Sequence, residues 1–186
     1  MKKFVLTFGL IAGAMMSVMM LITIPLQERI GFDHGEVIGY TTMVLAFLMV
    51  FFGVRSYRDR VAGGSVSFVR AFVLGLMITL VASACYVATW EVIYYKFYPD
   101  FGDKYAAHVL EKARASGATD AQLAVQTKQM EDFKAMYRNP LVNVAMTFLE
   151  PLPVGLVFTL VTAGALGRRR RPTAAAAQAA GSAGLF

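Results

Sequence analysis

Four stretches of the chain consist almost entirely of apolar residues and are long enough to cross a lipid bilayer. The first, residues 4–24, contains no charged side chain. As a helix rising about 1.5 Å per residue it would span roughly 30 Å, the thickness of the hydrocarbon core. The other three cover residues 37–54, 68–95 and 141–166. The pattern predicts an all-α membrane protein with four transmembrane helices.

A secretory signal peptide is the alternative interpretation of the first stretch, because Lys2 and Lys3 precede it. The apolar region of a signal peptide is usually only about 7–15 residues long and ends at a cleavage site with small residues. This stretch is longer, and the sequence Ile24-Pro25-Leu26-Gln27 follows it. We therefore predict a helix that the mature protein retains.

The segment between the third and fourth stretches, residues 96–140, is the largest polar part of the chain. Thr119 to Gln122 fits a capping box, in which the threonine side chain and the glutamine satisfy backbone groups at the start of a helix. An earlier short helix over 105–115, with a break at Ser116-Gly117, is expected before it. We predict a helical hairpin on the membrane surface. One transmembrane domain then covers residues 1–171, and a disordered Ala-rich tail covers 172–186.

The fourth stretch contains a carboxylate followed by two prolines, Glu150, Pro151 and Pro153. A helix that began at Pro151 would be about 24 Å long, which is short for a span. Proline removes a backbone donor and crowds the preceding turn, so it kinks a helix. We predict one kinked helix that runs through both prolines.

Composition and charge exclude an ordinary soluble domain. The chain has 186 residues, of which 57% are hydrophobic and 16% charged, whereas soluble domains carry about 25% charged residues. The net charge of +6 does not predict nucleic-acid binding, because the basic residues flank the apolar stretches. The single cysteine, Cys85, excludes an internal disulfide and a cage of cysteines around a metal.

The distribution of charge predicts how the chain crosses the membrane. The two ends and the loop after the second stretch hold ten basic residues against one acid, Asp59; the basic ones are Lys2, Lys3, Arg55, Arg58, Arg60, Arg70 and Arg168 to Arg171. Positive loops stay in the cytoplasm. We expect both termini in the cytoplasm and residues 96–140 outside, in the cytoplasmic (inner) membrane of a bacterium.

This topology places the residues of the candidate polar site on the outer side of the membrane. Glu36, Glu91 and Glu150 all lie there, with Arg138 as one nearby basic partner. A carboxylate inside a membrane is costly and needs a partner or a proton. The functional interpretation is a cation or proton site that opens outward. The alternative is a structural layer of ion pairs near the interface.

Small residues recur at four-residue spacing in three of the stretches. The candidates for helix packing are Gly9, Gly13, Gly75, Ser83, Gly155 and Ala163. Small residues let helix backbones approach closely inside lipid. Packing within one chain and a homo-oligomer interface both fit this pattern.

Catalytic and cofactor motifs are missing from the sequence, so we expect no enzymatic activity and no cofactor. His34 and His108 lack the spacing of metal ligands. Met15, Met16, Met19 and Met20 have a spacing that suits Cu(I), but methionine is also a common apolar filler, and we predict no metal.

Four short segments resemble a known family. They are Arg55-Ser56-Tyr57-Arg58-Asp59, Gly63-Gly64-Ser65-Val66-Ser67-Phe68, Pro99-Asp100-Phe101 and Glu150-Pro151-Leu152-Pro153-Val154-Gly155-Leu156. They resemble the bacterial membrane family called domain of unknown function 4199 (DUF4199). The resemblance implies a four-helix bacterial inner-membrane protein and supplies no catalytic residue or ligand.

Two functions remain open at this stage. The first is a non-enzymatic scaffold or accessory subunit that presents residues 96–140 to a protein partner. The alternative is a small oligomeric transporter, a proton- or cation-coupled carrier that uses Glu150 and the neighbouring carboxylates. The lipid bilayer is the one partner that composition predicts directly.

Overall fold

The computed structural model describes residues 1–168, apart from the side chains of Glu28 and Arg168, and the tail expected at 172–186 lies outside the described residues. The elements are α1 (Lys2–Ile30), α2 (Phe32–Arg60), β1 (Val66–Ser67), α3 (Phe68–Lys96), α4 (Phe101–Ala115), α5 (Asp120–Tyr137), α6 (Pro140–Leu149), α7 (Pro151–Leu166) and β2 (Gly167–Arg168). Four helical segments are long and apolar enough to cross a membrane: Lys2–Gln27, Phe32–Arg60, Phe68–Lys96 and Pro140–Leu166. The expected all-α membrane fold with four spans is confirmed.

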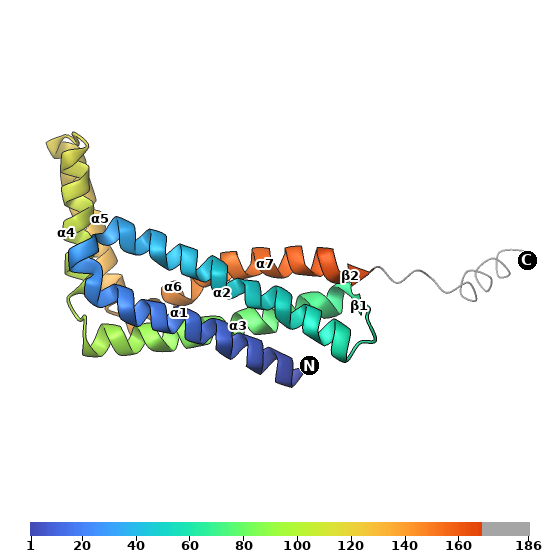
Figure 1. Ribbon diagram of the computed structural model, residues 1–186. Helices are drawn as coiled ribbons and strands as arrows, with labels where there is room; N and C mark the ends of the chain where they lie inside the picture. The colour runs from blue at the N-terminus through green and yellow to red at the C-terminus, as the bar shows by residue number, and fades with distance from the viewer. Residues whose placement is uncertain (169–186) are drawn as a thin grey trace, which may run out of the picture.

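The helices α1, α2, α3 and α7 run side by side as an elongated bundle (Figure 1). α1 packs on α2 and α3, and α7 packs on the same two helices from another side. The N-terminus, β1 and β2 lie at one end, which we call the terminal end, and α4 and α5 lie across the opposite end, which we call the α4–α5 end.

The helices α1 and α2 extend beyond the apolar stretches and nearly meet at the α4–α5 end. A single residue, Gly31, separates them, and its φ of 80° is a conformation that favours glycine. Pro25 lies inside α1. Asp33 and Glu36 therefore lie on the first turns of α2, although the apolar pattern predicted that the second stretch begins at residue 37.

A short parallel pairing closes the terminal end, and the sequence analysis did not predict it. Val66 of β1 pairs with Gly167 of β2. The chain turns before β1, where Gly63 and Gly64 adopt φ of 63° and 83°. A Cβ at Gly167 would lie 2.6 Å from the Cα of Phe68, so glycine permits the close approach of the two segments.

Buried side chains form two clusters along the bundle. The larger lies among the spanning helices and includes Phe47, Leu74 and Ile78. The smaller lies at the α4–α5 end, where Trp90 and Tyr94 of α3 meet Tyr137 of α5. The space between the two clusters contains the candidate site.

The helices α4 and α5 pack against one another. The predicted capping box is confirmed at the start of α5, where Thr119 and Gln122 exchange both hydrogen bonds. Lys134 donates to Glu131 at 2.8 Å and to Asp103 of α4 at 3.0 Å. These hydrogen bonds raise the pKa of Lys134, so the lysine stays charged and joins α5 to α4.

Candidate functional site: a polar cavity at the helix kink

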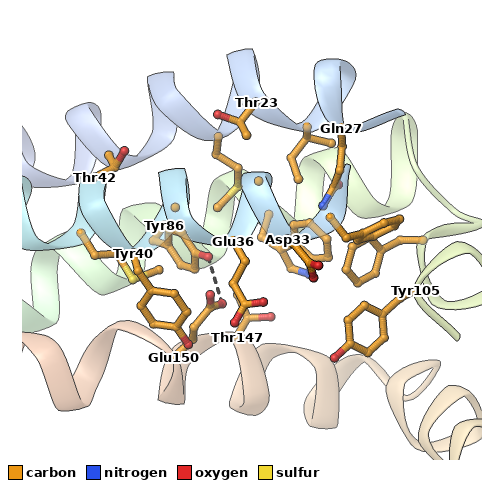
Figure 2. Close-up of a pocket in the computed structure, with 18 of the residues that line it drawn as sticks. Thr23, Gln27, Asp33, Glu36, Tyr40, Thr42, Tyr86, Tyr105, Thr147 and Glu150 are labelled. Atoms are coloured by element: carbon orange, nitrogen blue, oxygen red, sulfur yellow. Dashed lines mark hydrogen bonds between the residues drawn. The ribbon is translucent and has the colours of Figure 1, made fainter. Parts of the chain in front are cut away.

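A cavity of about 610 Å³ lies between the two core clusters, and residues from all six helices α1 to α6 line it. Figure 2 shows the side chains that point into it, with Thr23 and Gln27 from α1, Glu36 and Tyr40 from α2 and Tyr86 from α3. Ligand pockets in proteins usually measure about 300–1,000 Å³. The cavity is therefore large enough for a small organic molecule.

The kink of the fourth span explains why the bundle is open at this level. α6 ends at Leu149 and α7 begins at Pro151, where proline lacks the N–H that would continue the helix. α7 packs on both α2 and α3, whereas α6 packs chiefly on α3 and α5. The half of α2 nearer the α4–α5 end thus has less cover from the fourth span. Gly39 of α2 leaves further room, since a Cβ there would meet nothing within 4 Å.

Two of the predicted acids point into this cavity together. Figure 2 shows Glu36 of α2 beside Glu150, which lies between α6 and α7. The hydroxyl of Tyr86 donates a hydrogen bond of 2.9 Å to Oε2 of Glu150. Glu150 does not pair with Arg138, the basic partner that the sequence offered, and neither glutamate forms an ion pair among the described side chains. Tyrosine, and not arginine, is the partner of Glu150.

Asp33 on the first turn of α2 carries the third carboxylate of the cavity, and two basic groups of α4 engage it. Lys112 Nζ lies 2.8 Å and His108 Nε2 lies 3.2 Å from Oδ1 of Asp33. The hydrogen bond to Asp33 raises the pKa of Lys112. The ring of Phe32 stacks on His108 with 5.0 Å between centroids. This contact joins the start of α2 to α4 at the rim of the cavity.

Aromatic and methionine side chains form much of the remaining wall. Trp90 meets Phe101 edge to face, with 4.8 Å between ring centroids. Met16, Met19 and Met20 of α1 line the other side. Three of the four methionines that the sequence offered as Cu(I) ligands thus give the cavity a flexible apolar surface. No cluster of three metal-ligating His, Cys, Asp or Glu side chains occurs in the described part of the chain.

The predicted acid Glu91 and the predicted base Arg138 do not line this cavity. Glu91 lies on α3, and its buried Oε1 has no hydrogen-bond partner among the described residues. Arg138 follows the last residue of α5 as its C-cap. The structure therefore brings together two members of the predicted polar site, Glu36 and Glu150, and leaves the other two apart.

The small residues predicted for helix packing lie at contacts within the chain. A Cβ at Gly9 would lie 2.7 Å from Val81, and a Cβ at Gly13 would lie 2.6 Å from Cys85, both on α3. Gly75 of α3 faces Thr159 of α7, and Gly155 faces Thr79 and Phe47; Ser83 and Ala163 are fully buried. The hydroxyl of Thr79 donates to the carbonyl of Gly155 at 3.4 Å. In these contacts the small residues pack helices of one chain against one another.

Several residues of the site were missed by sequence reasoning, notably Tyr86, Trp90 and Gln27. Tyr86 and Trp90 lie in an apolar stretch, where an aromatic residue resembles any other core residue. The hydroxyl of Tyr86 and the indole N–H of Trp90 could have indicated the site, because a Tyr O–H or Trp N–H usually finds a hydrogen-bond partner when buried. Gln27 lies three residues after the first stretch, and an uncharged amide at the end of an apolar stretch does not by itself indicate a site.

Four membrane-capable helices define a multi-pass membrane protein. Comparison with protein families gives a narrower assignment. The chain belongs to the family described as protein of unknown function (DUF4199), whose profile matches residues 7–168. The family resemblance noted from the sequence is confirmed. No curated protein and no solved structure matches the chain.

Proposed function

We propose that the protein is a non-enzymatic carrier that binds a small molecule in the cavity at the helix kink. The observation that supports this proposal is the cavity itself, about 610 Å³ in volume and lined by polar and aromatic side chains from six helices. Concave sites of this size, with a few polar groups among apolar walls, are typical of ligand binding. Broken helices and carboxylates inside a bundle are typical of substrate paths through membranes.

The proposal includes an orientation in the membrane. Both termini lie on the cytoplasmic side of a bacterial inner membrane, and the cavity lies toward the opposite side. The charge pattern supports it, because Lys2, Lys3, Arg55, Arg58, Arg60, Arg70 and Arg168 belong to segments at the terminal end of the bundle. Positive segments stay in the cytoplasm.

A scaffold role is the second candidate, and the α4–α5 end supports it. Val125 and Met136 of α5 expose 58% and 54% of their surface, and the pair of helices projects sideways from the bundle (Figure 1). A protein partner could cover such side chains. This role would not require an open cavity, so filling the cavity distinguishes the two candidates.

Trp90 provides the readout for the test, because it lines the cavity and is the single tryptophan of the chain. The purified full chain in phosphatidylcholine nanodiscs is titrated with three tetramethylpiperidine nitroxides that carry an amine, a hydroxyl or a carboxylate. Nitroxides quench tryptophan fluorescence on contact. We expect at least one of them to quench Trp90 with a saturable dependence on concentration.

Two glycine variants make this test specific. Gly39→Leu places a side chain in the cavity, whereas Gly164→Leu adds the same side chain to α7, away from it; a Cβ at either position meets nothing within 4 Å. Gly39→Leu should weaken the saturable quenching about tenfold, and Gly164→Leu should not change it. Quenching that never saturates, or that is equal in both variants, contradicts the carrier proposal.

A further inference from the structure

The charge of the cavity is unbalanced. Of the described residues that line it, Asp33, Glu36 and Glu150 are acidic and only His108 and Lys112 are basic. Both basic groups are engaged by Asp33 at the rim. Glu36 and Glu150, the other two acids of the cavity, have no basic neighbour in ion-pair contact among the described side chains. A carboxylate inside a membrane bundle is costly without a positive partner or a proton, and a ligand with positive charge would supply that partner.

The hydrogen-bonding groups of the cavity specify the kind of cation. The carboxylates of Glu36 and Glu150 only accept hydrogen bonds when ionised. Gln27 of α1 adds an amide group to the lining, and its buried Oε1 has no donor among the described residues. Figure 2 shows Gln27 on α1, facing the same space as Glu36 on α2. Unmatched acceptors call for N–H donors, which a primary or secondary ammonium has and a quaternary ammonium lacks.

The walls specify the rest of the ligand. Tyr86, Trp90 and Tyr105 surround the space with aromatic rings, and Met16 and Met19 add apolar, flexible surface. A cation over an aromatic face gains roughly 0.5–2 kcal/mol, more as it loses water. Methionine surfaces adapt to ligands of different shape. Such walls suit a compact apolar body attached to the charged group.

We infer that the cavity binds a protonated primary or secondary amine attached to an apolar body, with its N–H groups directed at Glu36 and Glu150. This inference rests on the proposed carrier function and names its substrate class. The same chemistry occurs in free amphipathic amines and in the ethanolamine headgroup of a lipid. Both sources present an ammonium donor attached to an apolar body, and the experiment distinguishes one source from the other.

The experiment compares the three nitroxides, which share one apolar ring and differ in charge. In phosphatidylcholine nanodiscs, the amine should quench Trp90 with an apparent Kd at least tenfold below that of the hydroxyl compound, and the carboxylate should bind most weakly. Glu36→Gln and Glu150→Gln, singly and together, should abolish the advantage of the amine over the hydroxyl compound. Glu111→Gln, an exposed acid of α4 outside the cavity, is the control and should change nothing.

The outcomes are distinguishable. Equal affinity for all three nitroxides, or an amine advantage that survives both glutamine substitutions, overturns the amine inference and leaves the carrier proposal standing. No saturable quenching by any of them overturns the carrier proposal and the inference with it. If added phosphatidylethanolamine displaces the amine nitroxide, the inference holds with a lipid as the source. If the lipid has no effect, the inference holds with a free amine as the source.

Discussion

Asn143 is a polar residue inside the fourth apolar stretch, and it is completely buried. Its side-chain oxygen accepts hydrogen bonds from Nε1 of Trp90 at 3.1 Å and from the hydroxyl of Thr147 at 3.3 Å, and its amide donates to the carbonyl of Tyr137 at 3.5 Å. One side chain thus joins α3, α5 and α6. Buried polar networks of this kind restrict side-chain positions when every member is satisfied, so Asn143 holds Trp90 in place on the cavity wall.

Tyr137 belongs to the same network and gives the protein a predicted sensitivity to alkali. Burial raises the pKa of Tyr137 to about 12, whereas an unfolded tyrosine ionises near 10. The folded state therefore keeps a proton that the unfolded state loses between these values, and folding stability falls as pH rises from about 10 to about 12. Thermal unfolding in detergent should show a steeper loss across this range for the native chain than for Tyr137→Phe.

Tyr95→Phe is the matched control, because this tyrosine of α3 exposes 48% of its surface. It should leave the alkaline slope close to that of the native chain. An identical slope in the Tyr137→Phe variant would show that the burial of Tyr137 does not contribute to the pH dependence.

The sequence reveals individual residues of the site more readily than their arrangement. Glu36 and Glu150 could be identified because a carboxylate at the edge of an apolar stretch or within it is costly. Glu91 satisfied the same criterion and yet lies outside the cavity. The difference comes from the rotation of α3 and from the kink at Glu150, and neither follows from residue spacing alone. Tyr86 has its partner on another helix, which no local pattern indicates.

At the level of elements, the contact of α7 with α3 depends on Gly155. A Cβ at Gly155 would collide with Thr79 and lie 3.0 Å from the ring of Phe47, which is itself fully buried. Gly155→Leu should therefore destabilise the protein by about 1–3 kcal/mol or more, the cost of overpacking a filled interior. The loss would be measured as a lower Tm and a smaller monodisperse fraction in detergent.

Gly164→Leu, on the same helix but with open space around its Cβ position, should retain the Tm of the native chain. Equal Tm values for Gly155→Leu and Gly164→Leu would mean that the interface of α3 and α7 adjusts freely to a large side chain.

Apolar length predicts the four spans well, and local capping chemistry predicts the start of α5. The boundaries at the α4–α5 end were less accurate, because α1 continues past Pro25 to Ile30 and α2 already begins at Phe32. Contacts with α4 at the rim, such as the pairing of Lys112 with Asp33, support these additional turns. Such contacts between distant segments are invisible to a local hydropathy pattern.

For the molecule as a whole, the proposed orientation can be tested with reporter fusions. A reporter that is active only in the cytoplasm should be active when fused after Arg171 and inactive when inserted at Gly117, the turn between α4 and α5. The expectation follows from the excess of basic residues at the terminal end. The reverse result would place the cavity on the cytoplasmic side and overturn the charge argument.

The pairing of Val66 with Gly167 has a consequence for biosynthesis. Gly167 directly follows α7, so it leaves the ribosome only after all four spans have been made. β1, which precedes α3, therefore has no strand to pair with until translation has passed α7 and reached β2. We expect nascent chains that stop short of this point to lack the pairing of β1 with β2 at the terminal end, which distinguishes an incomplete bundle from a finished one.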